Sequence, residues 1–149
     1  MITDTRLYKV LTLTGTLPFL ASAVIAAGGA SSISALLPAA ELAGSYGLAI
    51  LSFLCGTHWA TQLHSREDLP TNLLLISNFI VVAVWITYLI PGNEVLMLTT
   101  QIIAFLYLLH IDRSLLRGGR ITRDYFGVRL QATAIAILSL LVVIYLDLG

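Results

Sequence analysis

Residues 110–148 read HIDRSLLRGGRITRDYFGVRLQATAIAILSLLVVIYLDL, a basic segment that leads directly into a mainly apolar one. The apolar part, roughly 130–148, has the ~20 residues that a helix rising ~1.5 Å per residue needs to cross a bilayer. Four earlier stretches match that length, at roughly 10–29, 42–63, 72–91 and 95–111. We therefore predict an all-α fold: a polytopic membrane helical bundle of five transmembrane helices, in a single domain that covers residues 1–149.

The eight Lys and Arg residues fall in segments that alternate along the chain. They occupy the N-terminal segment, the second loop, and the fourth loop with its flanks: Arg6, Lys9, Arg66, Arg113, Arg117, Arg120, Arg123 and Arg129. The only charges in the first loop, the third loop and the C-terminal tail are acids: Glu41, Glu94 and Asp147. Because cytoplasmic loops retain Lys and Arg, we predict a cytoplasmic N-terminus and a C-terminus outside.

Composition supports a membrane protein and narrows its chemistry. With 58% hydrophobic and 11% charged residues, the chain has too little polar surface to cover a soluble domain. The single cysteine, Cys55, excludes an internal disulfide and a cysteine-rich metal site. We predict no metal, no cofactor and no nucleic-acid partner, and the lipid bilayer as the main surrounding.

The second apolar stretch carries polar side chains on one face. At 100° per residue, an arc of roughly 120° contains Ser52, Cys55, His58, Trp59 and Gln62. Polar groups in hydrocarbon are costly unless they face protein or water, so this face is predicted to point into the bundle. The alternative is that Trp59 and Gln62 lie at the cytoplasmic headgroups, where amphipathic side chains are favoured.

Beside this face runs a small-xxx-small seam of Ser52, Gly56 and Ala60. Small residues four apart let another helix approach closely in a membrane. The seam is therefore predicted to be a helix-packing site.

His58 is the main functional candidate, because it lies eight residues before Arg66 and hence ~12 Å below the loop by helix rise. An imidazole at that depth can relay protons, ligate a metal or hydrogen-bond a neighbouring helix. Other polar residues share its depth, and Asp112 is expected to pair with Arg129 or Arg113. The predicted polar vestibule consists of His58, Trp59, Gln62, Asn78, Asp112, Arg113, Tyr125 and Arg129.

The rest of the spans carries fewer polar side chains, and no continuous polar path across the bilayer is evident. Pro18 in the first span follows Thr14, Gly15 and Thr16. This grouping predicts a bend whose freed carbonyl is satisfied by a threonine hydroxyl.

Two segments resemble the signatures of a known family. Residues 52–59, SFLCGTHW, preceded by Tyr46 and Leu51, and a second group of Asp112-Arg113, Tyr125, Arg129-Leu130 and Thr133 carry the likeness. They resemble small bacterial inner-membrane proteins related to the animal mitochondrial transmembrane protein 69, over roughly 44–136. Cys55 departs from that pattern, where glycine is expected. The family has no known function, so the resemblance implies a bacterial inner-membrane location, a topology and candidate residues, but no reaction.

Three classes of function are consistent with these features. The first is a non-enzymatic accessory or assembly component that docks onto partner subunits of a membrane complex or forms a homo-oligomer. The second is an oligomeric proton or small-solute channel or transporter that uses the vestibule around His58. The third is a cofactor protein with haem between His58 and His110. No HExxH, GxSxG or Walker pattern occurs, so no enzyme and no catalytic residue is predicted.

Overall fold

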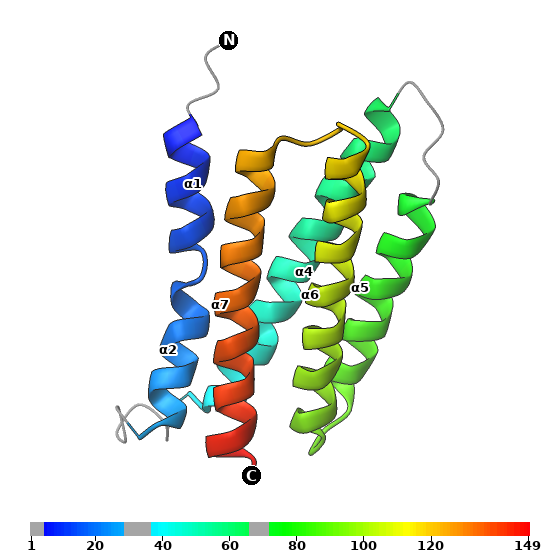
Figure 1. Cartoon of the computed structure of the whole chain (residues 1–149). Helices are drawn as coiled ribbons and strands as arrows, with labels where there is room; N and C mark the ends of the chain where they lie inside the picture. The colour runs from blue at the N-terminus through cyan, green and yellow to red at the C-terminus, as the bar shows by residue number, and fades with distance from the viewer. Residues whose placement is uncertain (1–4, 29–36, 66–71) are drawn as a thin grey trace.

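The computed structural model describes residues 5–28, 37–65 and 72–149, and every regular element in these ranges is a helix. In chain order the helices are α1 (Thr5–Thr14), α2 (Leu17–Ala26), α4 (Ala39–His64), α5 (Leu73–Leu89), α6 (Glu94–Arg117) and α7 (Arg123–Asp147). They stand side by side along one direction, with α1 and α2 stacked end to end as a single column (Figure 1). The all-α prediction is confirmed.

Four helical segments among the described residues are long and apolar enough to cross a membrane: Arg6–Ala26, α4, α6 and α7. The fifth, α5, has 17 apolar-rich residues and lies at the short end of the range for membrane-spanning helices. The chain is thus a helical bundle of the kind found in membrane proteins. A fifth crossing by α5 remains a prediction.

Several helix bounds differ from the predicted spans. The first helix begins at Thr5 rather than near residue 10, α6 continues to Arg117, and α7 begins at Arg123. The physical reason is that hydropathy marks only the part of a helix that fits hydrocarbon, whereas Arg and Lys are good helix formers and continue the helix beyond it. Three helices therefore extend into the basic flanks.

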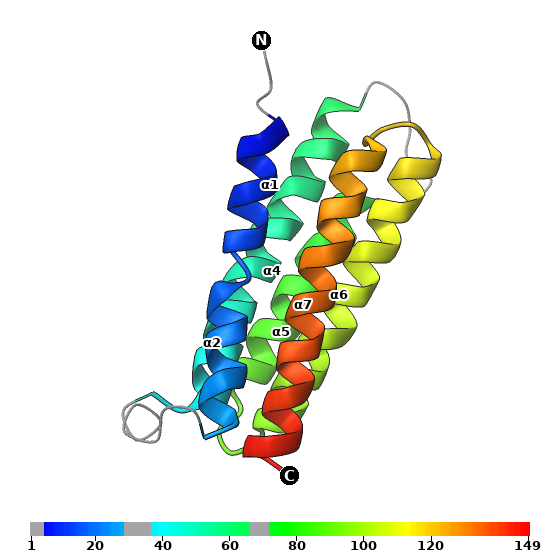
Figure 2. The same cartoon turned by 60° about the vertical axis from the view of Figure 1, so that its left-hand side comes forward.

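The column of α1 and α2 lies beside α4 and α7 (Figure 2). α4 occupies the centre of the arrangement, because it contacts α2, α5, α6 and α7. The start of α1 and the end of α7 lie at opposite ends of the bundle (Figure 1). The described Lys and Arg residues gather at the end where α1 begins, on the helix termini and on the loop between α6 and α7.

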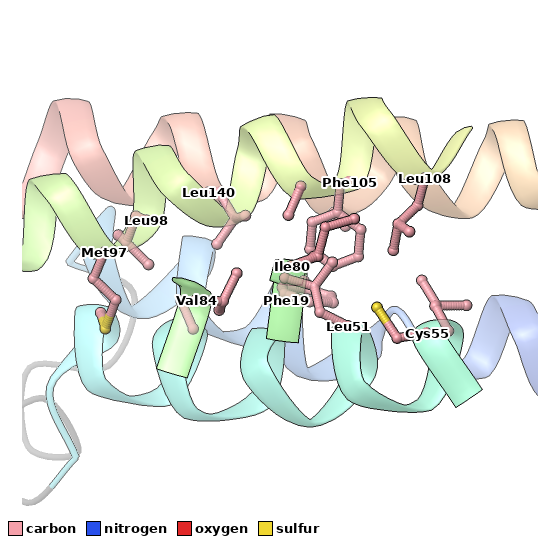
Figure 3. Packing of buried hydrophobic residues seen from close by; sticks show 14 of the residues in the cluster. Phe19, Leu51, Cys55, Ile80, Val84, Met97, Leu98, Phe105, Leu108 and Leu140 are labelled. Carbon is pink, nitrogen blue, oxygen red and sulfur yellow. The ribbon is translucent and has the colours of Figure 1, made fainter. Parts of the chain in front are cut away.

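The middle of the bundle is filled by large apolar side chains from α2, α4, α5, α6 and α7. Phe19 of α2, Leu51 of α4, and Phe105 and Leu108 of α6 are all at most 2% exposed, and they meet in the core shown in Figure 3. Leu140 of α7 belongs to the same cluster. In lipid this packing acts through close van der Waals contact rather than through hydrophobic exclusion.

Two glycines allow α4 to approach α6 closely. A Cβ atom built on Gly47 would lie 1.9 Å from Oε1 of Gln101, and one on Gly44 would lie 2.3 Å from Cε of Met97. The Gln101 amide Nε2 donates to the Gly44 carbonyl at 2.7 Å, and Gln101 is fully buried. The backbone of α4 thus serves as packing surface and as acceptor for a buried amide.

The predicted seam of Ser52, Gly56 and Ala60 is not used in this way. All three residues are exposed, and a Cβ on Gly56 would meet nothing within 4 Å. Within the described residues no helix packs on this seam, so its role in helix packing stays a prediction. Spacing alone identifies a small face of a helix but not the side of the bundle to which that face turns.

The bend predicted at Pro18 is present, as a break between α1 and α2. The amide of Phe19 bonds to the Thr16 carbonyl, which leaves the Gly15 carbonyl without its usual helical donor. The Tyr46 hydroxyl of α4 donates to that carbonyl at 2.8 Å. The expected donor was a threonine, but the hydroxyls of Thr14 and Thr16 bond to carbonyls of the preceding turn.

Gly47→Ala tests the close contact of α4 with α6. The new methyl group overlaps the buried Gln101 amide, and such overpacking costs about 1–3 kcal/mol of folding free energy. The matched control is Gly127→Ala, because a Cβ there meets nothing within 4 Å. Equilibrium unfolding in mixed detergent micelles should show a lower stability for Gly47→Ala only. Equal stability of the two variants would contradict the contact.

Candidate functional site

Three buried polar side chains from three helices meet in the half of the bundle nearest the basic end. His58 of α4, Asp112 of α6 and Arg129 of α7 are 3%, 2% and 6% exposed. Nε2 of His58 lies 2.8 Å from Oδ1 of Asp112, and Nε of Arg129 donates to Oδ2 of Asp112 at 2.9 Å. One carboxylate therefore accepts from both neighbouring helices.

This arrangement offsets the cost of placing charge in a membrane interior. An isolated ion there loses several kcal/mol of hydration, and the loss is recovered only when the partner charge and the hydrogen bonds are well placed. Each Asp112 oxygen has its own donor, and the opposite charges of Asp112 and Arg129 balance. The hydrogen bond requires a proton on His58 Nε2, which leaves Nδ1 buried and without a partner among the described residues.

A small cavity of about 270 Å³ borders the network on the side of the loop between α6 and α7. His58 and Asp112 line it together with Tyr125 of α7, Thr122 just before α7, and Thr57 of α4. Three residues of the predicted vestibule, His58, Asp112 and Tyr125, therefore line one cavity, and the loop between α6 and α7 provides one of its walls.

Of the predicted site residues, four are brought together: His58, Asp112, Tyr125 and Arg129. The predicted pairing of Asp112 is resolved in favour of Arg129, because Arg113 is exposed. The choice follows from helix geometry. Arg113 is the next residue to a buried Asp112 and so points about 100° away, whereas Arg129 approaches from a different helix.

Gln62, Trp59 and Asn78 lie outside this cluster. Gln62 is half-buried, and its Oε1 accepts from the Leu73 amide at 3.1 Å, which satisfies one free N–H at the start of α5. Trp59 is 40% exposed, and Asn78 faces outward on α5. The polar arc predicted for α4 is thus divided between the interior and the outer surface.

The arrangement suggested for haem is not present in the described residues. His58 is buried with Nε2 bound to Asp112, whereas His110 is exposed and its ring stacks near Tyr107 at 6.5 Å. The two imidazoles do not face a common cavity. Within the described ranges, no group of three or more His, Cys, Asp or Glu side chains could hold a metal ion.

The polar network does not continue toward the other end of the bundle. Leu51 and Leu54 of α4 and Phe105 and Leu108 of α6 occupy the next turns, and all four are buried. Beyond them the main buried polar side chain in contact with α4 is Gln101, which bonds to the Gly44 carbonyl. Through the described interior, the network therefore ends at an apolar layer.

Sequence reasoning missed some residues of this region. Thr57 could not be recognised as a site residue from the sequence, because a threonine in a membrane helix commonly bonds to its own backbone. Thr57 also makes such a bond, to the Leu54 carbonyl. Tyr8 precedes the first predicted span, yet its ring lies 6.2 Å from that of Tyr125. Tyr125, Arg129 and Thr133 follow one another at four-residue spacing along α7, and this spacing is the signal in the sequence that places them on one helix face.

Asp112→Ala is expected to destabilise the bundle strongly. The variant leaves Arg129 buried without its counter-charge, and the loss of one partner of a buried pair costs about 3–5 kcal/mol. Arg113→Ala, which removes an exposed charge, is the control and should change stability by about 0.5 kcal/mol or less. Unfolding in mixed micelles measures both. The double variant Asp112→Leu/Arg129→Met should be more stable than Asp112→Ala, and the reverse order would contradict charge balance as the cause.

A family model described as a protein of unknown function (DUF3429) matches residues 5–145. No curated protein and no solved structure matches the chain. The matched range extends from the first described helix to the last turn of α7 and includes His58, Asp112 and Arg129. Since this match covers nearly the whole bundle, the chain belongs to the DUF3429 family of proteins of unknown function.

Proposed function

We propose that this protein is a non-enzymatic accessory component of a bacterial inner-membrane complex, and that it docks a transmembrane helix of a partner subunit onto the outer face of α4. The observation that carries the proposal is the exposed seam of Ser52, Gly56 and Ala60. A seam of this kind in a lipid-facing position offers a flat surface for close helix approach, which is the common basis of helix association in membranes.

The seam is suited to contact because it has neither bulk nor unsatisfied polar groups. A Cβ at Gly56 would meet nothing within 4 Å, so this backbone is open to a partner. The Ser52 hydroxyl donates to the Leu48 carbonyl at 2.8 Å and is already satisfied. A partner helix can therefore approach the α4 backbone without displacing a side chain.

Asn78 on α5 provides the polar part of the same proposal. Gln62 of α4 bonds to Leu73 at the start of the antiparallel α5, so five residues along each helix place Asn78 roughly level with Thr57. Its amide is exposed. A carboxamide that faces hydrocarbon is unfavourable unless a neighbouring helix bonds to it, and such bonds hold membrane helices together.

A transport role has less support, because the buried apolar layer of Leu51, Phe105 and Leu108 interrupts the polar interior. A role in haem binding lacks a shared pocket for His58 and His110. We further propose the kinship with mitochondrial transmembrane protein 69 on the basis of the SFLCGTHW segment and the residues from Asp112 to Thr133. That kinship and the positive-inside distribution support the bacterial inner membrane and a cytoplasmic N-terminus.

Native mass spectrometry of the full chain, released gently from its own membrane, tests the docking. We expect a complex with a partner subunit that is lost in Gly56→Ala, where the added methyl group holds the helices apart. Asn78→Leu should weaken the same complex. Gly127→Ala adds the same methyl to another open helical glycine and should leave the complex intact.

Two results would refute the proposal. One is a bare protomer from wild-type membranes under conditions that preserve other membrane complexes. The other is a complex that persists unchanged in Gly56→Ala and Asn78→Leu. A symmetric oligomer of this chain alone that is lost in Gly56→Ala would preserve the seam but replace the foreign subunit by a second copy.

Orientation is tested by accessibility in a background in which Cys55, the only cysteine, is replaced by alanine. Asn93→Cys, in the turn between α5 and α6, should react with a membrane-impermeant maleimide in intact spheroplasts. Gly118→Cys, just beyond α6, should react only after permeabilisation. The opposite pattern would invert the topology.

A further inference from the structure

A second and larger cavity is lined by residues of α1, α2, α4 and α7, and by Phe105 of α6. Figure 2 shows how the column of α1 and α2 stands beside α4 and α7. The volume of the cavity is about 390 Å³, within the range of small-molecule sites. Two of its lining side chains, Leu11 of α1 and Phe53 of α4, are 61% and 67% exposed. The mouth therefore opens sideways between α1 and α4, where a membrane protein faces lipid. A ligand would enter from the membrane rather than from water.

Most of this cavity is apolar and partly aromatic. Ile50, Leu54 and Ala136 contribute aliphatic surface, and the rings of Phe19 and Phe105 meet edge to face at 5.8 Å on one side. Such walls accept a hydrocarbon chain and the face of a flat ring.

The cavity lining also contains hydrogen-bond donors. The hydroxyl oxygens of Tyr8 and Thr133 are buried and have no partner among the described residues. Tyr125 and Arg129 line the same cavity. Burying a hydroxyl without a partner is unfavourable, so two such groups that converge on one cavity indicate a ligand that supplies acceptors.

The charge of the lining selects among possible ligands. Arg129 is the only charged residue in the lining within the described ranges, and its Nε–H is bound to Asp112 at 2.9 Å. The carboxylate balances the guanidinium, so no net positive charge remains to hold an anionic headgroup. The site thus favours an uncharged head with acceptor oxygens.

We propose that this cavity binds a membrane quinone: a flat ring with carbonyl oxygens on an isoprenoid or alkyl tail. The carbonyl oxygens accept from the hydroxyls of Tyr8 and Thr133, and the tail leaves between Leu11 and Phe53 into the lipid. No protein donor has to give up an existing bond for this contact. On an ideal helix Phe53 lies about 60° around α4 from Gly56, so the mouth of the cavity borders the docking seam, whereas Ile50 and Thr57 lie about 100° or more from Gly56. Quinone binding uses none of the seam residues.

The test uses the purified full chain in phospholipid nanodiscs and a photoreactive benzoquinone with a ten-carbon tail. We expect saturable crosslinking that an excess of unlabelled decylubiquinone abolishes. Peptide mapping should place the crosslinks on the segments around Tyr8 and Thr133. Tyr8→Phe and Thr133→Val each remove one donor without breaking a bond within the protein, and each should weaken half-saturation about three- to ten-fold.

Ser77→Ala is the matched control, because the Ser77 hydroxyl is also buried without a described partner but does not line this cavity. Its half-saturation should equal that of wild type. Non-saturable labelling, or labelling equally strong in Tyr8→Phe and Thr133→Val, would overturn the proposal. Palmitate that displaces the probe as well as decylubiquinone does would also overturn it, since the site would then recognise a chain rather than a quinone ring.

Discussion

The bundle depends on the carboxylate of Asp112, which lies in the bundle interior, where burying a charge costs free energy. Asp112 of α6 binds His58 of α4 through one oxygen and Arg129 of α7 through the other. In lipid the association of helices receives little help from hydrophobic exclusion, so directional contacts carry more of the specificity of packing. Because three helices must bring their polar groups to one point, their rotation and relative depth are set together. The two cavities described above both border residues of this network or their direct neighbours.

Much of the fold could be predicted from sequence because hydropathy reports directly on the environment of a membrane helix. The five apolar stretches correspond to the described helices, and the basic residues gather at one end of the bundle. The partnership of Asp112 with Arg129 could also be anticipated, since an ion within a span must find its counter-ion. His58 and Tyr125 completed the group because they lie at the same depth.

The rest could not be predicted because depth and helical face do not determine which way a helix turns. Asn78 lies at the predicted depth but faces outward, and Ser52 and Gly56 face outward as well. Conversely, Gly47 is essential to the approach of α6 but carries no distinctive pattern around it. Tyr8 enters the larger cavity from outside the predicted span. Each of these placements depends on the angle of one helix against its neighbours, which is a property of the assembled bundle.

The break between α1 and α2 has a consequence for the order of events during folding. Its exposed Gly15 carbonyl is satisfied by the Tyr46 hydroxyl, a group that belongs to a helix made later in translation. A newly inserted first segment has no such donor in hydrocarbon, where an open carbonyl costs several kcal/mol. The bend follows from Pro18 within the first segment itself, whereas the bond from Tyr46 forms only when α4 packs against it. Assembly thus supplies the donor that a kinked first helix lacks when it is alone in the bilayer.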